Sequence, residues 1–127
     1  MHGKHFYEYA VIRVLPKVER EEFVNVGVIL FSRSAKYIGM KYQLDKTYLR
    51  HSPTELDIDL LEKTLISFQK IAEGAAEGGK IASLDIAERF RWLTAVRSTC
   101  LQTSVPHNGF CEDPQKTLEK LFEEFVL

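Results

Sequence analysis

The sequence lacks an excess of either charge and lacks a long apolar run, and each absence argues against a class of protein. Its 127 residues carry 17 Lys and Arg against 18 Asp and Glu, a formal net charge of -1. A dedicated duplex-DNA binder needs a basic face that displaces counterions, so nucleic acid is not a favoured partner, although a local basic patch is compatible with this charge. The longest apolar run, VGVILF, is far shorter than the roughly 20 residues that span a bilayer, so no membrane segment is predicted.

Cysteine is also scarce, and the start of the chain has no apolar segment. Two cysteines, Cys100 and Cys111, are too few for a disulfide framework. The first residues, MHGKHFYEY, do not resemble a secretory signal. Together these features predict a reduced, cytoplasmic protein. With 45% hydrophobic and 28% charged residues, the chain is expected to fold as a single domain over residues 1–127.

The first third of the chain has the pattern of an antiparallel sheet. Aromatic and β-branched residues between polar turns predict strands at about 5–16, 22–33 and 36–44, the last two forming a hairpin. Alternation along the first strand predicts a core-like face of Phe6, Glu8, Ala10, Ile12 and Val14. The second strand divides into Val24, Val26, Val28 and Leu30 on one face and Phe23, Asn25, Gly27, Ile29 and Phe31 on the other.

After these strands the apolar spacing changes to three and four residues, which predicts helices. The first helix, at about 53–73, starts at the capping-box pattern SPTE and ends at Gly74. Its expected buried stripe is Ile58, Leu61, Leu65, Phe68 and Ala72. Two further helices are predicted at about 84–97 and 114–126, with a loop or a short strand pair between them. Strands followed by helices predict an α+β fold, with the helices packed on one face of the sheet.

Asn25 and Gly27 are unusual inside a strand, because both residue types weaken strands. If the first two strands pair, Arg13 can share a face with Asn25, and the glycine leaves room above the sheet for another backbone, an aromatic ring or a ligand. These residues then form a polar pocket. The alternative interpretation is a β-bulge, with Asn25 bonded to local backbone and Arg13 paired with a nearby glutamate.

The second candidate region is ERFRWLTAVRSTCLQTS, at 88–104. Trp92 lies off the apolar stripe of its helix, so it either binds a partner or a ring, or packs inside the domain. Arg91 and Arg97, with Ser98, are candidates for holding a phosphate. No Gly-rich loop accompanies them, so they are not a P-loop, and an arginine that caps helix carbonyls is the alternative.

Cys100, His107 and Cys111 are spaced too loosely for zinc, and neither a metal site nor a cofactor is predicted. His107, in a turn-rich loop, is a candidate acid or base. No nucleophile with an orienting carboxylate stands at a recognisable spacing. Catalysis is therefore left open, and a role other than an enzyme is favoured.

Two long segments resemble one bacterial protein family. YEYAVIRVLPKVEREEFVNVGVILF and RFRWLTAVRSTCLQTS, followed by CEDP and an amphipathic helix, resemble domain-of-unknown-function family 3037 over nearly the whole chain. The resemblance implies no reaction. It implies a protein partner, because members often lie beside a kinase-like protein resembling the HipA toxins. The matching blocks contain both polar clusters, so Arg13 and Asn25 are expected to converge with Arg91 and Arg97.

Two hypotheses about function follow. The first is a small cytoplasmic binding or accessory protein that acts with a protein partner, such as a HipA-like kinase, through an exposed patch around Trp92. The second is a phosphate-handling enzyme, or a nucleotide or nucleic-acid binder, with an arginine-rich pocket. The residues assigned to that pocket are Arg13, Arg91, Arg97, Ser98 and His107.

Overall fold

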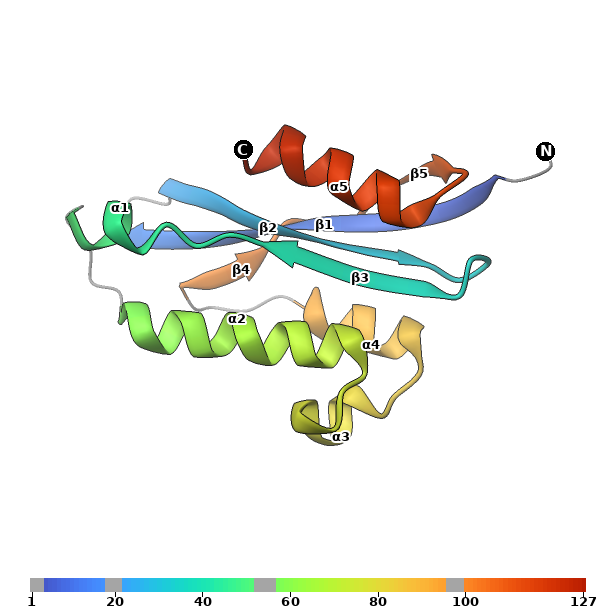
Figure 1. Ribbon diagram of the computed structural model, residues 1–127, viewed down its shortest axis with the longest axis horizontal. Helices are drawn as coiled ribbons and strands as arrows, with labels where there is room; N and C mark the ends of the chain where they lie inside the picture. Colours follow the sequence, from blue (N-terminus) through green and yellow to red (C-terminus); the bar gives the residue numbers. More distant parts are fainter. Residues whose placement is uncertain (1–3, 18–21, 52–56, 96–99) are drawn as a thin grey trace.

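A twisted antiparallel sheet runs through the centre of the molecule, with helices above and below it (Figure 1). The computed structural model describes residues 4–17, 22–51, 57–95 and 100–127. The strands are β1 (His5–Lys17), β2 (Glu22–Ser32), β3 (Tyr37–Tyr42), β4 (Leu101–Thr103) and β5 (His107–Cys111). Their order is β3-β2-β1-β4, and β5 also pairs with β1. The predicted α+β class and the hairpin of β2 and β3 are confirmed.

The helices are α1 (Lys46–His51), α2 (Ile58–Glu73), α3 (Gly79–Ala82), α4 (Ile86–Leu93) and α5 (Pro114–Phe125), with a 3-10 turn, η2 (Ala76–Gly78). α2 begins at Ile58, after the predicted start, because the Asp57 side chain accepts a hydrogen bond from Leu60 N–H at 3.0 Å. The SPTE pattern at 52–55 lies outside the described residues. Gly74, with a φ of 71°, ends α2 as predicted.

The predicted apolar stripe of α2 is confirmed, but the helices do not all pack on one face. Residues of α2 and α4 form one core cluster with Ile12, Ile29 and Phe31. Residues of α5 form a second cluster with Val28 and Leu30, which alternate with Ile29 and Phe31 along β2. α5 therefore covers the face opposite to α2 and α4 (Figure 1). The sheet has apolar side chains on both faces, so each face needs its own helical cover.

A bulge in β2 changes which residues share a face. Ile12 pairs with Gly27, but the next residue, Arg13, pairs with Asn25, so Val26 is the extra residue. Val24 and Val26 therefore join the α2 and α4 side, with Ile29 and Phe31 beyond the bulge. The list of faces predicted from simple alternation is wrong across this point, and the bulge interpretation is confirmed.

Candidate functional site

Asn25 holds the C-terminal end of α5 against the sheet. Its Nδ2 donates to the carbonyl of Phe125 at 3.0 Å, a partner remote in sequence and not the local backbone that was expected. Arg13, opposite Asn25 in the register, lies over the ring of Phe23, with 4.3 Å from Cζ to the ring centroid. Arg13 Nε and Asn25 Oδ1 are buried and have no hydrogen-bond partner among the described residues. This Asn25 cluster (Arg13, Phe23, Asn25 and Phe125) joins a helix end to two strands.

Gly27 does not open space above the sheet. A Cβ built on it would lie 2.8 Å from Lys41 O and 2.9 Å from Tyr42 Cβ, both on the neighbouring strand β3. It would also lie 3.1 Å from Ile12 Cδ1. Another backbone, that of β3, therefore occupies the space beside Gly27, which is one of the three predicted occupants. The interpretation of Gly27 as the floor of a ligand pocket is wrong.

Arg91 lines a pocket of about 380 Å³ beside the turn between β2 and β3. The lining residues come from β1, the end of β2, the β2–β3 turn and α4: Phe6, Glu8, Phe31, Arg33, Ser34 and Arg91. We call this the Arg33–Arg91 pocket. Phe31 stacks on Phe90 of α4, with 5.3 Å between centroids, so the apolar wall is fixed by the core.

The predicted convergence of the two arginine clusters does not occur for the residues that can be placed. Arg13 and Asn25 lie on the α5 side of the sheet, whereas Arg91 is on α4, on the opposite side. Arg97 and Ser98 lie outside the described residues. His107 is exposed on β5, and its ring centroid is 5.6 Å from that of Tyr9, so it joins neither arginine group.

Trp92 packs at least partly inside the domain. Its ring meets Phe68 of α2 edge to face, with 5.9 Å between centroids, and 38% of the residue stays exposed. The helix stripe prediction placed it off the buried face of α4, and its half-exposed position agrees with that. That a partner binds the exposed part of the Trp92 side chain stays a prediction.

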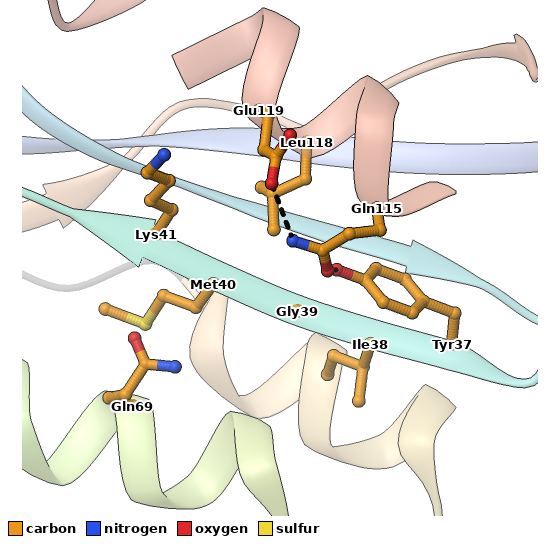
Figure 2. A pocket seen from close by; sticks show the side chains of 9 residues that line it. All are labelled: Tyr37, Ile38, Gly39, Met40, Lys41, Gln69, Gln115, Leu118 and Glu119. Carbon is orange, nitrogen blue, oxygen red and sulfur yellow. Dashed lines mark hydrogen bonds between the residues drawn. The ribbon is translucent and has the colours of Figure 1, made fainter. Parts of the chain in front are cut away.

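A second hollow follows β3, the edge strand of the sheet, between α2 and α5 (Figure 2). Its volume is about 350 Å³. It is lined by Tyr37, Ile38, Gly39, Met40, Lys41, Gln69, Gln115, Leu118 and Glu119. We call it the β3 groove. In Figure 2, Met40 points toward Gln69 of α2 and Ile38 points to the same side of the strand, whereas Tyr37 and Lys41 point toward α5.

Tyr37 is fixed at one end of the β3 groove by a chain of hydrogen bonds. Its hydroxyl donates to Gln115 Oε1 at 2.7 Å, and Gln115 Nε2 donates to Glu119 Oε1 at 3.3 Å. The ring lies over Gly39, where an added Cβ would collide with the phenol. Burial, and then the nearby carboxylates of Glu119 and Asp113, raise the pKa of Tyr37 above its ordinary value.

The backbone of β3 has unused hydrogen-bonding groups on its outer edge. Gln43 N–H donates to Val26 O at 2.7 Å, which sets the pattern of the β2–β3 ladder. Hydrogen bonding alternates along the ladder, so the backbone N–H and C=O groups of Lys41 and Gly39 point toward β2. The backbone N–H and C=O groups of Ile38 and Met40 point away from β2. Within the described ranges, no hydrogen bond engages the outward groups of Ile38 and Met40.

Sequence reasoning did not single out the residues of the β3 groove or most of the Arg33–Arg91 pocket. Phe6 was expected only on a core face, yet 46% of Phe6 is exposed, and it lines this pocket. One general rule does apply: a strand at the edge of a sheet leaves the backbone N–H and C=O groups of its outer side unpaired. Using it required the strand order, which is a property of the fold.

The described residues contain neither a cluster of metal-binding side chains nor a membrane-spanning helix. No three side chains of His, Cys, Asp or Glu gather there in a way that would hold a metal ion. No helix in those ranges is long and apolar enough to cross a membrane.

Comparison with known proteins leads to one family. No curated protein and no solved structure gives a significant match to the chain. One family model matches residues 9–126, nearly the whole chain. The chain therefore belongs to the family described as "Protein of unknown function (DUF3037)".

Proposed function

We propose that this is a small accessory protein that binds a protein partner by adding an extended segment of that partner to the β3 edge. The observation that carries the proposal is the outer edge of β3, where the backbone groups of Ile38 and Met40 have no partner among the described residues. Strand addition uses such groups for affinity and uses flanking side chains for specificity.

The walls of the β3 groove support a single extended chain as the occupant. Side chains of α2 and α5 border the strand on its two sides, through Gln69 below and through Gln115 and Glu119 above (Figure 2). Gln115 is bonded to Tyr37 and Glu119, and Gln69 is bonded to Glu73. Each amide keeps a second N–H and an oxygen lone pair, which can complement the peptide groups of an added strand. A second copy of this chain would bring its own α2 and α5 to the same edge, and the helices would oppose each other.

Charge adds a preference for particular partner side chains. Lys41 lies over the ring of Phe122, with 4.9 Å from Nζ to the centroid, which holds its ammonium on the α5 side. Glu119 lies on the same side of the groove. An added segment with one acidic and one basic residue on its α5-facing side matches this pair.

The compartment and the identity of the partner are part of the same proposal. A cytoplasmic bacterial setting fits the reduced cysteines, and the family resemblance makes a HipA-like kinase the first partner to test. The test is a titration of that kinase with the purified protein by calorimetry, together with selection of displayed twelve-residue peptides on the protein.

Proline at position 38 is the decisive variant. Ile38→Pro removes an N–H that faces away from β2, so the β2–β3 ladder keeps its bonds while strand addition loses a donor. Ile38→Ala is the matched control, because it shortens the same side chain and keeps the N–H. We expect binding to survive in Ile38→Ala and to fall at least tenfold in Ile38→Pro.

Two results would refute the proposal. One is that the selected peptides or the kinase bind Ile38→Pro and Ile38→Ala with equal affinity, which would place the interface elsewhere. The other is self-association of the protein alone that Ile38→Pro abolishes, since the occupant would then be a second copy. Light scattering over a range of protein concentrations measures the latter.

A further inference from the structure

The Arg33–Arg91 pocket combines charge and aromatic surface in a way that the β3 groove does not. From its lining we propose that this pocket binds a nucleoside monophosphate, with the phosphate on the two guanidinium groups and the base against the phenylalanines. The inference is independent of strand addition at β3, because the two hollows have no lining residue in common.

The two arginines are available to an anion. The ion pair formed within the described ranges is Lys46–Glu62, and neither Arg33 nor Arg91 has a carboxylate within bridging distance there. Both side chains are exposed. A planar guanidinium presents two parallel N–H groups to phosphate oxygens, so two arginines from different elements can grip a phosphate from two directions.

Ser34 is a further polar group at the rim. Its hydroxyl lies 2.8 Å from His5 Nδ1, which fixes its position beside Arg33. The hairpin turn itself is held by Ser32, whose hydroxyl donates to Phe6 O at 2.8 Å and accepts from Ala35 N–H at 3.4 Å. The turn is thus tied to β1, so Arg33 projects from an anchored part of the backbone.

Aromatic surface and volume indicate a ring in the rest of the pocket. Phe6 is 46% exposed and meets Phe110 edge to face at 5.5 Å, so part of the Phe6 ring is open to a ligand. Phe31 adds a second apolar wall. A base stacks on such rings regardless of its identity. The volume of about 380 Å³ lies within the usual range of small-molecule sites.

Glu8 favours bases that carry an exocyclic amino group. It lines the same pocket and stands opposite Phe31 in the β1–β2 register. A carboxylate repels phosphate but accepts hydrogen bonds from an amino group. A ligand that keeps its phosphate at the arginines and its amino group at Glu8 uses both charges, and adenosine monophosphate has that arrangement.

A free nucleotide fits the protein better than a nucleic-acid strand. Strand binding needs a basic groove that follows many phosphates, together with successive stacking rings. The chain has a net charge of -1, and the pocket lining holds two arginines beside one glutamate. One phosphate is therefore matched, and a row of phosphates is not.

Calorimetric titration with adenosine monophosphate tests the site. Arg33→Gln and Arg91→Gln should each weaken binding at least tenfold, whereas Lys63→Gln, an exposed change on α2 outside the pocket, should leave it unchanged. Adenosine and ribose 5-phosphate should bind at least tenfold more weakly than the nucleotide, because each lacks one half of the recognised group. Circular dichroism of every variant establishes that it is folded.

A second comparison separates the role of Glu8 from general charge effects. Purine riboside monophosphate lacks the amino group of adenosine monophosphate, so the wild-type protein should prefer the latter and Glu8→Ala should not. Absence of saturable nucleotide binding up to millimolar concentration would overturn the proposal, as would binding that ignores both arginine variants. If a 5′-phosphorylated dinucleotide or a longer strand binds more tightly than adenosine monophosphate, the proposal of a free nucleotide is wrong and the ligand is a nucleic acid.

Discussion

The substitution Gly27→Ala tests whether the space beside Gly27 is filled by β3 or is open to a ligand. The new methyl would stand 2.8 Å from Lys41 O and 2.9 Å from Tyr42 Cβ, where normal contacts begin near 3.5 Å. β2 and β3 must therefore separate by roughly half an ångström. Overpacking of this kind costs about 1–3 kcal/mol, and the stiffer unfolded chain returns about 0.4–1 kcal/mol. The net expectation is a loss of about 1–2 kcal/mol in the free energy of unfolding.

Urea denaturation followed by circular dichroism and by the fluorescence of the single tryptophan measures this loss. A melting temperature lower by roughly 4–8 °C should accompany it in a chain of this size. Gly39→Ala is a comparison and not a neutral control, because its Cβ would collide with the Tyr37 phenol, which must then give up its hydrogen bond to Gln115. Stability should therefore fall in this variant too, through a side chain and not through separation of the β2 and β3 backbones. Unchanged stability in Gly27→Ala would refute the packing argument and restore the pocket interpretation.

Three further changes test other parts of the structure. Asn25→Ala should lower the free energy of unfolding by about 1–2 kcal/mol in urea titrations, because it leaves a carbonyl at the end of α5 without its donor. Trp92→Ala should cost about 1.5–2.5 kcal/mol and still fold, since only part of the ring packs on Phe68. Stability should fall in strongly alkaline solution: burial and then Glu119 raise the folded pKa of Tyr37 above 10, so the unfolded chain loses this proton first. The contribution of Tyr37 to the free energy of unfolding is complete below about pH 10 and is lost as the pH rises through the folded pKa. Urea titrations at several pH values should therefore show a smaller loss of stability at high pH in Tyr37→Phe than in the wild-type protein.

The fold class was predictable because its signals are local. The α2 stripe, from Ile58 to Ala72, and the hairpin of β2 and β3 follow from residue spacing within single elements. The placement of α5 was not predictable in this way. β1 and β2 have apolar residues on both faces, with Val28 and Ile29 both fully buried, so the pattern alone did not show which helix covers which face.

The bulge shows the limit of alternation as a rule. One additional residue, Val26, exchanges the faces of everything before it in β2 relative to everything after it. Asn25 and Gly27 correctly indicated an irregularity, but their spacing did not show on which side the extra residue lay. That choice depends on pairing with Ile12 and Arg13 in another strand, which is information from tertiary structure.

The separation of the arginine clusters has the same origin. Arg13 alternates with Ile12 and Val14, whose side chains enter the core under α2 and α4, so Arg13 must face α5. Arg91 belongs to α4, which packs on the core side. The sheet therefore stands between the two arginine groups that were expected to converge. Two residues of the segments that carry the family resemblance thus have different roles here: Asn25 holds α5 in place, and Arg91 borders an open pocket with Arg33.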